Sequence, residues 1–381
     1  MARIIVGSYL VQFPLGGYMS WVGQWLLGFQ RLGHEVWLVE RSYGPNSCYD
    51  PSSNVMTDDC SYGTAQVGSF LARHGLEKRW CFVDFGKTYH GCERASIEDV
   101  LRAADLFVDM GSHGLWLDEA ASIPLRVFVD GEPGYRQMMF ETTGREGHAL
   151  PEYERYYSVG LNVGTPACIA PDAGKHWRPI FDPVVTDLFS CEPPPTRAPF
   201  TTVMSWQAHS PIEFNGVTYG QKDVEFAKFM DLPCRVKAPM ELAISGKNTP
   251  IDLLKKQGWR LLDSFRVTLT FDSWQDYIRG SRGEFSVAKN VFVATNSGFF
   301  SDRSAAYLAS GRPVVMQETG FSAHLPCGSG LFAVRNVEEA AAAIDSIESD
   351  YTRHSRDARE IAVEYLDTRR VLGNFLRELG L

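Results

Sequence analysis

The stretch "SGFFSDRSAAYLASGRPVV", from Ser297 to Val315, carries the pattern on which the whole chain is built. Its apolar residues have helical spacing up to the glycine at position 311, and a strand-like run begins directly afterwards. A helix, a glycine turn and a strand in this order are typical of alternating α/β proteins. Asp302 and Arg303 form a charged pair at the front of the predicted helix, in an otherwise apolar unit. This pair is the first candidate for a function.

The same alternation continues on both sides of this stretch through the second half of the chain. Strands are predicted at 200–206, 240–246, 289–295 ("KNVFVAT") and 312–317. Helices are predicted at 222–230, 250–258, 272–281, 301–311 and 337–347. Residues 351–379 have the spacing of one or two amphipathic helices.

The first half of the chain has the same plan. Strands at 3–11 and 34–40 enclose a helix at 18–33 that ends at a glycine, and strands at 105–114 and 125–135 end in glycine-rich loops. A short helix is predicted at 96–104, with Ser96 as its N-cap. Such alternation indicates parallel, doubly wound sheets, in which ligands bind beyond the carboxyl ends of the strands.

A change of composition separates the two halves. Pro193, Pro194 and Pro195 cannot continue a helix or a central strand, so a linker is expected there. We therefore predict a Rossmann-like domain at 1–188 and a second one at 189–355. The last segment, 356–381, is predicted to be a helix that packs back toward the first domain.

Composition limits the possible classes of protein. The chain has 381 residues, 44% of them hydrophobic and 22% charged, with a net charge of −9, which argues against a broad nucleic-acid surface. No apolar run approaches the roughly 20 residues that span a bilayer, and the first residues read as a strand, not as a signal peptide. The eight cysteines are scattered without a Cys-x-x-Cys, which favours reduced thiols and a cytoplasmic location.

Two stretches resemble the GT-B glycosyltransferases. "LGGYMSWVGQWLLGFQRLGHEVWLVE" is similar to the opening of many members, and "DRSAAYLASGRPVVMQETGF" is similar to the signature of the group 1 glycosyl transferases. The resemblance implies two Rossmann-like domains that face a cleft. It also implies a hexosyltransferase-like enzyme that binds a nucleotide sugar against the second domain and an acceptor against the first, with no further cofactor.

The chain departs from that signature at its two glutamates. Their places fall on Gly298 and Ala306, so the side chains that would hold the donor sugar and the ribose hydroxyls are missing. Asp302, Ser304 and Glu318 are the candidates to replace them. The donor sugar, the base and the choice between retention and inversion stay open.

Three cations are predicted to neutralise the diphosphate of the donor. Lys222 and Arg303 begin predicted helices, Lys289 precedes a predicted strand, and in group 1 members a lysine that reaches the phosphates resembles Lys222. Each could equally be a solvated surface charge.

Several neighbouring residues complete the predicted donor site. Ser297 and Gly298 would offer close backbone approach, as would Gly16 and Gly17, although all four also fit ordinary turns. His209 is a weaker candidate on the donor side.

Acids and a histidine follow two predicted strands of the first half. Asp109 and His113 come after one strand, and Asp130 and Glu132 after the next, where they could take the proton of an acceptor hydroxyl. Asp130 and Glu132 could instead begin a Pro-Gly turn. Trp21 at helical spacing is either core or a platform for a small-molecule acceptor.

No linear metal motif is present, neither His-x-x-His nor Asp-x-Asp, and the transferase is therefore predicted to work without a metal. Two rivals to a transferase stay open. One is a sugar-nucleotide epimerase on the same two-domain plan, and the other is a non-catalytic protein that closes over a ligand.

Overall fold

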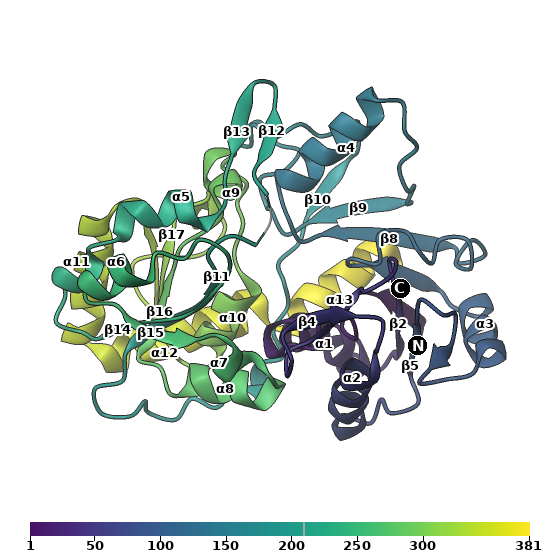
Figure 1. Ribbon diagram of the computed structural model, residues 1–381, viewed down its shortest axis with the longest axis horizontal. Helices are drawn as coiled ribbons and strands as arrows, with labels where there is room; N and C mark the ends of the chain where they lie inside the picture. The colour runs from purple at the N-terminus through teal and green to yellow at the C-terminus, as the bar shows by residue number, and fades with distance from the viewer. Residues whose placement is uncertain (209) are drawn as a thin grey trace.

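The computed structural model describes residues 1–208 and 210–381. Two sheets form the centres of two lobes (Figure 1). The first has eight strands in the order β10-β9-β8-β7-β1-β2-β5-β6, and the second has six in the order β15-β14-β11-β16-β17-β18. Every neighbouring pair is parallel except β5 and β6. The prediction of parallel, doubly wound sheets is thus confirmed.

The first lobe consists of β1 (Arg3–Gly7), α1 (Gly16–Arg31), β2 (Glu35–Arg41), the hairpin β3 (Cys48–Asp50) and β4 (Val55–Thr57), α2 (Ser61–Arg73), β5 (Trp80–Val83), β6 (Tyr89–His90), α3 (Arg94–Arg102), β7 (Leu106–Asp109), β8 (Leu125–Asp130), α4 (Tyr135–Arg145), β9 (Arg155–Ser158) and β10 (Trp177–Pro179). The central strand β1 is apolar on both faces: Ile4, Ile5 and Val6 are fully buried, as expected for a strand covered by helices on each side.

The second lobe consists of β11 (Phe200–Ser205), the hairpin β12 (Ile212–Phe214) and β13 (Val217–Tyr219), α5 (Lys222–Phe226), β14 (Met240–Ser245), α6 (Ile251–Lys256), β15 (Arg260–Asp263), α7 (Phe265–Thr268), α8 (Phe271–Arg279), β16 (Gly283–Ser286), α9 (Asn290–Ala294), α10 (Asp302–Ala309), β17 (Val314–Gln317), β18 (Leu331–Val334), α11 (Val337–Ser349) and α12 (Tyr351–Ile361). A π-helical turn follows α12 and leads into α13 (Thr368–Leu379).

The strand order places a topological switch point in each sheet. In the second sheet the chain runs from β11 outward through β14 and β15 and then returns to β16 on the other side of β11. In the first sheet the same reversal falls between β1 and β7. Loops diverge at such points and leave a crevice at the carboxyl ends of the strands, where doubly wound proteins bind their ligands.

The C-terminal helix α13 lies against the first lobe, where it packs on α1 (Figure 1). Phe375 meets Trp25 of α1 and Tyr157 of β9 with ring centroids 5.9 and 5.0 Å apart. Backbone hydrogen bonds of Val184 to Leu366 and Thr368 fix the crossing of this segment. The chain therefore passes twice between the lobes.

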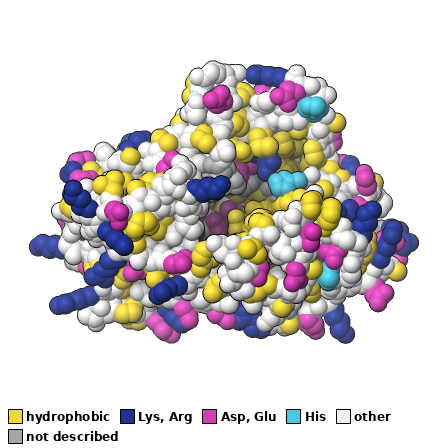
Figure 2. All heavy atoms as spheres, viewed as in Figure 1, with side chains coloured by type: hydrophobic (Ala, Val, Ile, Leu, Met, Phe, Trp, Pro, Cys, Tyr) yellow, Lys and Arg dark blue, Asp and Glu magenta, His cyan; other side chains and the backbone are white. Residues whose placement is uncertain are grey.

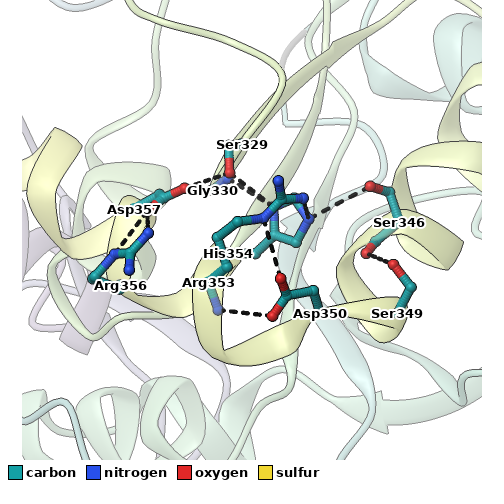
Figure 3. Close-up of polar contacts among 9 residues, drawn as sticks. All are labelled: Ser329, Gly330, Ser346, Ser349, Asp350, Arg353, His354, Arg356 and Asp357. Atoms are coloured by element: carbon teal, nitrogen blue, oxygen red, sulfur yellow. Dashed lines mark hydrogen bonds and ion pairs between the residues drawn. The ribbon is translucent and has the colours of Figure 1, made fainter.

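A buried histidine fixes α12 on the second lobe (Figure 3). His354 is fully buried; its Nδ1 accepts the backbone N–H of Gly330 at 3.2 Å, and its Nε2 lies 3.4 Å from the Ser346 hydroxyl. The Ser329 hydroxyl donates to Asp357 at 2.5 Å, so its proton points away from the imidazole. This arrangement joins α11, α12 and the start of β18, and it is not that of an activated serine.

Two local predictions are wrong. The stretch 289–295 forms the helix α9, and the strand lies earlier, at β16. Sequence periodicity missed this strand because Glu284 lies at its centre, where it is fully buried and paired with Arg303. Ser96 is not an N-cap either, because α3 begins at Arg94 after Glu93.

Among the described residues, no helix has the length and apolarity needed to cross a membrane.

Candidate functional site

Arg303 lies at the switch point of the second sheet. It is the second residue of α10, and its Nε donates to Glu284 Oε1 at 2.5 Å. Its terminal nitrogens donate to the Ser286 hydroxyl at 2.6 Å and to the Val203 carbonyl oxygen at 3.1 Å. The guanidinium is therefore anchored to the ends of β16 and β11. A guanidinium has five N–H groups, and these three bonds leave two for a ligand.

Lys222 is the first residue of α5 and is partly buried. Burial lowers the pKa of its ammonium to about 7, and the positive charges of Arg303 and Lys289 lower it further, against the opposing effect of Glu284 and Glu132. Within the described chain, no side chain accepts a hydrogen bond from this ammonium. An anion bound beside it would supply the missing partner.

Lys289 occupies the N-cap position of α9, and its Nζ donates to both oxygens of Glu132 at 2.5 and 2.6 Å. Glu132 follows β8 of the first sheet, so this ion pair joins the carboxyl ends of the two sheets. Arg303 and Lys289 are both close enough to Lys222 to lower the pKa of its ammonium. With Lys222 they form what we call the cationic cluster, and the structure does bring these three predicted residues together.

The other predicted donor-side residues near α10 have structural surroundings. Ser297 is fully buried, and its hydroxyl accepts the Phe299 N–H at 3.3 Å. Gly298 has φ of 76°, and a Cβ there would lie 2.8 Å from the Asn162 backbone nitrogen, so this glycine allows the two lobes to approach closely. The Ser304 hydroxyl is buried against Met316, inside the second lobe.

Glu318 does not take the place of a missing signature glutamate in this structure. Its carboxylate accepts the Gly320 backbone N–H at 2.6 Å and the Ser322 hydroxyl at 2.5 Å. Both bonds stabilise the turn that follows β17. Ser304 is likewise turned into the core, which leaves Asp302 of the three candidates.

Asp302 is close to a second carboxyl group that sequence reasoning missed. Asp182 accepts the indole N–H of Trp21 at 2.9 Å and that of Trp25 at 3.5 Å. Burial raises the pKa of Asp182 to about 7, with a further contribution from the charge of Asp302. Burial also raises the pKa of Asp302, against the effect of Arg303. Asp182 and Asp302 come from opposite sides of the crevice, and the negative charge of one raises the pKa of the other.

Two of the four predicted acceptor-side residues serve the loops they begin. Asp109 is fully buried, and its oxygens accept three backbone N–H groups, those of residues 111, 112 and 114, and the Tyr153 hydroxyl at 2.6 Å. Asp130 is also buried and accepts from the Glu132 backbone, Gln137 and Ser158. Carboxylates whose oxygens are taken by donors in this way hold the loops that they begin, and burial raises the pKa of Asp130 against the effect of these donors. We assign both a structural role.

His113 is better placed, whereas Glu132 is held in its ion pair with Lys289. His113 is exposed at φ of 53°, and its ring meets Tyr43 edge-on at 5.3 Å. The surrounding protein lowers the pKa of its imidazole by desolvation, and the charge of Arg136 lowers it further. His113 is therefore neutral at pH 7, as a general base must be.

Two tyrosines that the sequence analysis missed, Tyr9 and Tyr18, lie beside Trp21, which it named as core or as an acceptor platform. Tyr9 contacts Tyr18 with ring centroids 5.4 Å apart and Trp21 at 5.8 Å. Burial raises the pKa of Tyr18 to about 12, and the charges of Glu132 and Asp302 raise it further, which places this phenol between the two lobes. Figure 2 shows a hollow between the lobes with hydrophobic side chains on its walls. We call Tyr9, Tyr18 and Trp21 the aromatic wall.

The glycine pair at the start of α1 contributes to the contact between the lobes. A Cβ at Gly16 would lie 2.3 Å from the Thr270 carbonyl oxygen at the start of α8, whereas a Cβ at Gly17 would meet nothing closer than 3.9 Å. Trp25, at the same helical spacing as Trp21, is fully buried in the core. The candidate His209 lies outside the described residues.

A separate cavity of about 310 Å³ lies between β9, β10 and α13. Its lining includes Tyr157, Phe181, Tyr365 and Phe375 and none of the predicted site residues. The cavity is thus distinct from the crevice described above.

Neither protein-family models nor curated proteins match this sequence. Solved structures do. An alpha-glucosyltransferase in complex with UDP and a 13-mer DNA has a TM-score of 0.60 and 11% identity, covering 100% of this chain and 99% of its own. HepE from Anabaena, in complex with UDP and glucose, has a TM-score of 0.59 and 10% identity, covering 100% of both chains. Sucrose-phosphate synthase from Thermosynechococcus elongatus has a TM-score of 0.54 and 13% identity, covering 100% and 99%.

All three are GT-B proteins, and each matches this chain over essentially its whole length. The likeness therefore includes both sheets and the C-terminal crossing to the first lobe, and not one Rossmann-like unit alone. At identities of 10–13%, the likeness shows that the chains share an architecture and does not show that they share a chemistry. The chain has the GT-B fold, two Rossmann-like domains that face each other across a cleft.

Proposed function

We propose that this protein is a glycosyltransferase that moves a sugar from a nucleoside-diphosphate sugar to an acceptor hydroxyl. One observation carries the proposal: Lys222, whose ammonium has no hydrogen-bonding partner among residues 1–208 and 210–381, lies beside two further cations at the switch point of the second sheet. Arg303 and Lys289 are already paired with Glu284 and Glu132, so Lys222 is the member of the cluster whose charge a diphosphate would balance. The UDP complexes of the structural neighbours support the same ligand class.

Each cation has a distinct part in this scheme. Arg303 offers two N–H groups to the diphosphate from a position fixed by β16 and β11, and α10 begins at the same place, with the positive end of its dipole. A bound anion raises the pKa of the Lys222 ammonium, so a larger fraction of the protein carries the positive charge at Lys222 when the diphosphate is bound. Together they stabilise the leaving diphosphate as the bond to the sugar breaks, which we propose occurs without a metal.

The acceptor hydroxyl must lose its proton during transfer, and we propose that His113 accepts it. His113 is neutral at pH 7, and Asp109 and Asp130 are saturated by other donors. Glu132 instead positions Lys289 through their ion pair. The aromatic wall fits a small, partly apolar acceptor, and the net charge of −9 disfavours the DNA seen with one neighbour. The cytoplasmic location stays a prediction.

The first test is binding. The purified protein is heated with UDP, TDP and GDP sugars at concentrations far above micromolar, and at least one of them should raise the unfolding temperature, since a ligand of the native state stabilises it. If no nucleotide raises it, the proposal is wrong.

The second test is turnover. Arg303→Ala should lower transfer by about 100-fold or more, whereas Arg260→Ala, which removes an exposed arginine from edge strand β15, should leave it unchanged. Sugar products formed without any acceptor would favour the epimerase. Nucleotide binding without any product would favour a non-catalytic binding protein.

A further inference from the structure

Three side chains of different chemistry meet at the edge of the first sheet, away from the cationic cluster. Cys60 precedes α2, Asp84 follows β5, and His90 ends β6. His90 Nε2 lies 3.0 Å from Asp84 Oδ2 and 3.5 Å from Cys60 Sγ, and all three atoms lie within 4.8 Å of one another. We call these three residues the Cys60 cluster.

The geometry differs from that of a catalytic relay. In a Cys-His-Asp relay the thiol and the carboxylate lie on opposite nitrogens of the imidazole, so that the acid orients the ring for the thiol. Here both the thiol and the carboxylate approach the same nitrogen, Nε2. A nitrogen has one lone pair or one proton and cannot serve both. Three donor atoms that converge on one point are arranged as ligands of a cation.

The spacing fits a tetrahedral metal. Around Zn²⁺ the bond lengths to sulfur, nitrogen and oxygen place neighbouring ligand atoms about 3.3–3.8 Å apart. The contacts of 3.0 and 3.5 Å need shifts of a few tenths of an ångström, and the thiol-to-carboxylate pair, within 4.8 Å, needs to close by no more than about 1.5 Å. The side chains of Asp84 and His90 are 18% and 29% exposed, which leaves a path for an ion.

One of the three groups is already oriented by a second partner. Asp84 Oδ1 accepts the Thr88 backbone N–H at 2.8 Å, which turns Oδ2 toward the imidazole. A fixed second partner of this kind is usual around metal ligands. Cys60 lies at the N-cap position of α2, and its side chain makes no capping hydrogen bond there.

The electrostatic surroundings favour a cation over a free thiolate. Burial raises the pKa of the Cys60 thiol, and the negative charges of Asp84, Asp59 and Glu40 raise it further. Cys48 has a thiol nearby, whose pKa is raised by burial and by Cys60 to about 12. A cation bound here would be attracted by these negative charges and would offset them.

We infer that the Cys60 cluster binds a divalent cation of the zinc class through Cys60 Sγ, Asp84 Oδ2 and His90 Nε2. A thiolate and an imidazole select zinc-like ions over Mg²⁺ and Ca²⁺, which prefer oxygen ligands. Binding releases the thiol proton of Cys60, and water or Cys48 takes the fourth position. The absence of a linear motif does not bear on this site, because its ligands come from three separate segments.

Such an ion would stabilise a contact between the lobes. Cys48 begins the hairpin β3–β4, and Tyr49 in the same strand meets Phe265 of α7 with ring centroids 6.1 Å apart. A cation held beside this hairpin therefore ties a contact with the second lobe to the edge of the first sheet. The inference does not depend on the proposed transferase.

The test uses the full-length protein, stripped with a chelator and titrated with Zn²⁺ alone. About one equivalent should bind per chain, with release of about one proton and a rise in the unfolding temperature. Cys60→Ser and His90→Gln should each weaken Zn²⁺ binding at least about 100-fold, since loss of a ligand exceeds the 10–100-fold cost of losing a second-shell partner. Cys234→Ser, an exposed thiol on the second lobe, is the matched control and should bind normally.

A second measurement covers variants that fail to fold. Co²⁺ added to the stripped native protein should give an ultraviolet thiolate-to-metal charge-transfer band that Zn²⁺ abolishes. The inference is overturned if the folded native protein binds no Zn²⁺. It is equally overturned if Cys60→Ser binds Zn²⁺ as tightly as the native chain does.

Discussion

Replacing Lys222 with methionine should weaken nucleotide binding and at the same time stabilise the free protein. Methionine keeps the length of the side chain and removes its charge. In the free protein, this charge repels those of Arg303 and Lys289 and is partly desolvated. In the complex it would meet a phosphate. Binding sites typically contain residues that lower the stability of the free protein and raise its affinity for the ligand.

The magnitudes follow from the pKa. A fall from 10.5 to about 7 corresponds to no more than about 5 kcal/mol, and partial solvent access reduces the expected gain for Lys222→Met to about 2 kcal/mol. Because the unfolded chain holds this proton between about pH 7 and 10.5 and the folded chain does not, wild-type stability should rise with pH across that window. The stability gain of the variant is therefore largest at pH 7 and below, and disappears toward pH 10.5.

Whereas the stability of the free protein should rise with pH, its affinity for the nucleotide should fall. Loss of a charge-assisted hydrogen bond, worth about 1.5–3 kcal/mol, weakens UDP binding by about 10–150-fold. Above pH 7 the phosphates of UDP are fully ionised, since their last pKa is about 6, and only the protein loses protons. Wild-type affinity should then fall by up to about tenfold per pH unit.

Calorimetric titration with UDP from pH 6 to 9 measures both effects. Lys222→Met should abolish the pH slope, and Lys222→Arg should keep the affinity high at pH 9. Lys255→Met, which removes an exposed lysine from α6, is the control and should behave as wild type. Equal affinity and equal slope in Lys222→Met and wild type would refute the reasoning.

Three further predictions address the lobes and the acceptor side. Gly16→Ala should lower the free energy of unfolding in urea by about 1–3 kcal/mol, because its Cβ meets the Thr270 carbonyl oxygen, whereas Gly17→Ala should cost nothing. His113→Gln should lower kcat by about 10²–10⁴-fold and leave UDP affinity unchanged; normal turnover would exclude His113 as the base. The folded protein holds a proton on Asp182 that the unfolded chain loses between about pH 4 and 7, so stability should fall as pH rises through that window. Asp182→Asn should flatten this dependence in denaturation curves, and an unchanged profile would contradict the burial of that carboxyl group.

The sequence predicts the fold well where elements are apolar and periodic. β1 and β17 read as continuous buried runs because helices cover both faces of each sheet. β16 could not be found, because Glu284 at its centre is neutralised by Arg303, 19 positions further along the chain. A charge within a strand argues against burial until its partner is known.

For the candidate site, the sequence identifies positions better than roles. Lys222 and Arg303 could be located because each begins a predicted helix at the carboxyl end of the second sheet, whereas Lys289 is predicted to precede a strand and in fact lies at the N-cap of α9. Asp109 lies at a strand end, as predicted, but its oxygens are taken by backbone N–H groups that only the folded loop presents. Asp182 and Tyr18 have no local signal, because their environment is created by the other lobe.

The most direct test of the central claim is a crystal structure of the protein soaked with UDP. We predict that the diphosphate lies within hydrogen-bonding distance of the free N–H groups of Arg303 and of the Lys222 ammonium, at the start of α10. Nucleotide bound elsewhere on the molecule, with Lys222 and Arg303 still facing only protein, would contradict the account.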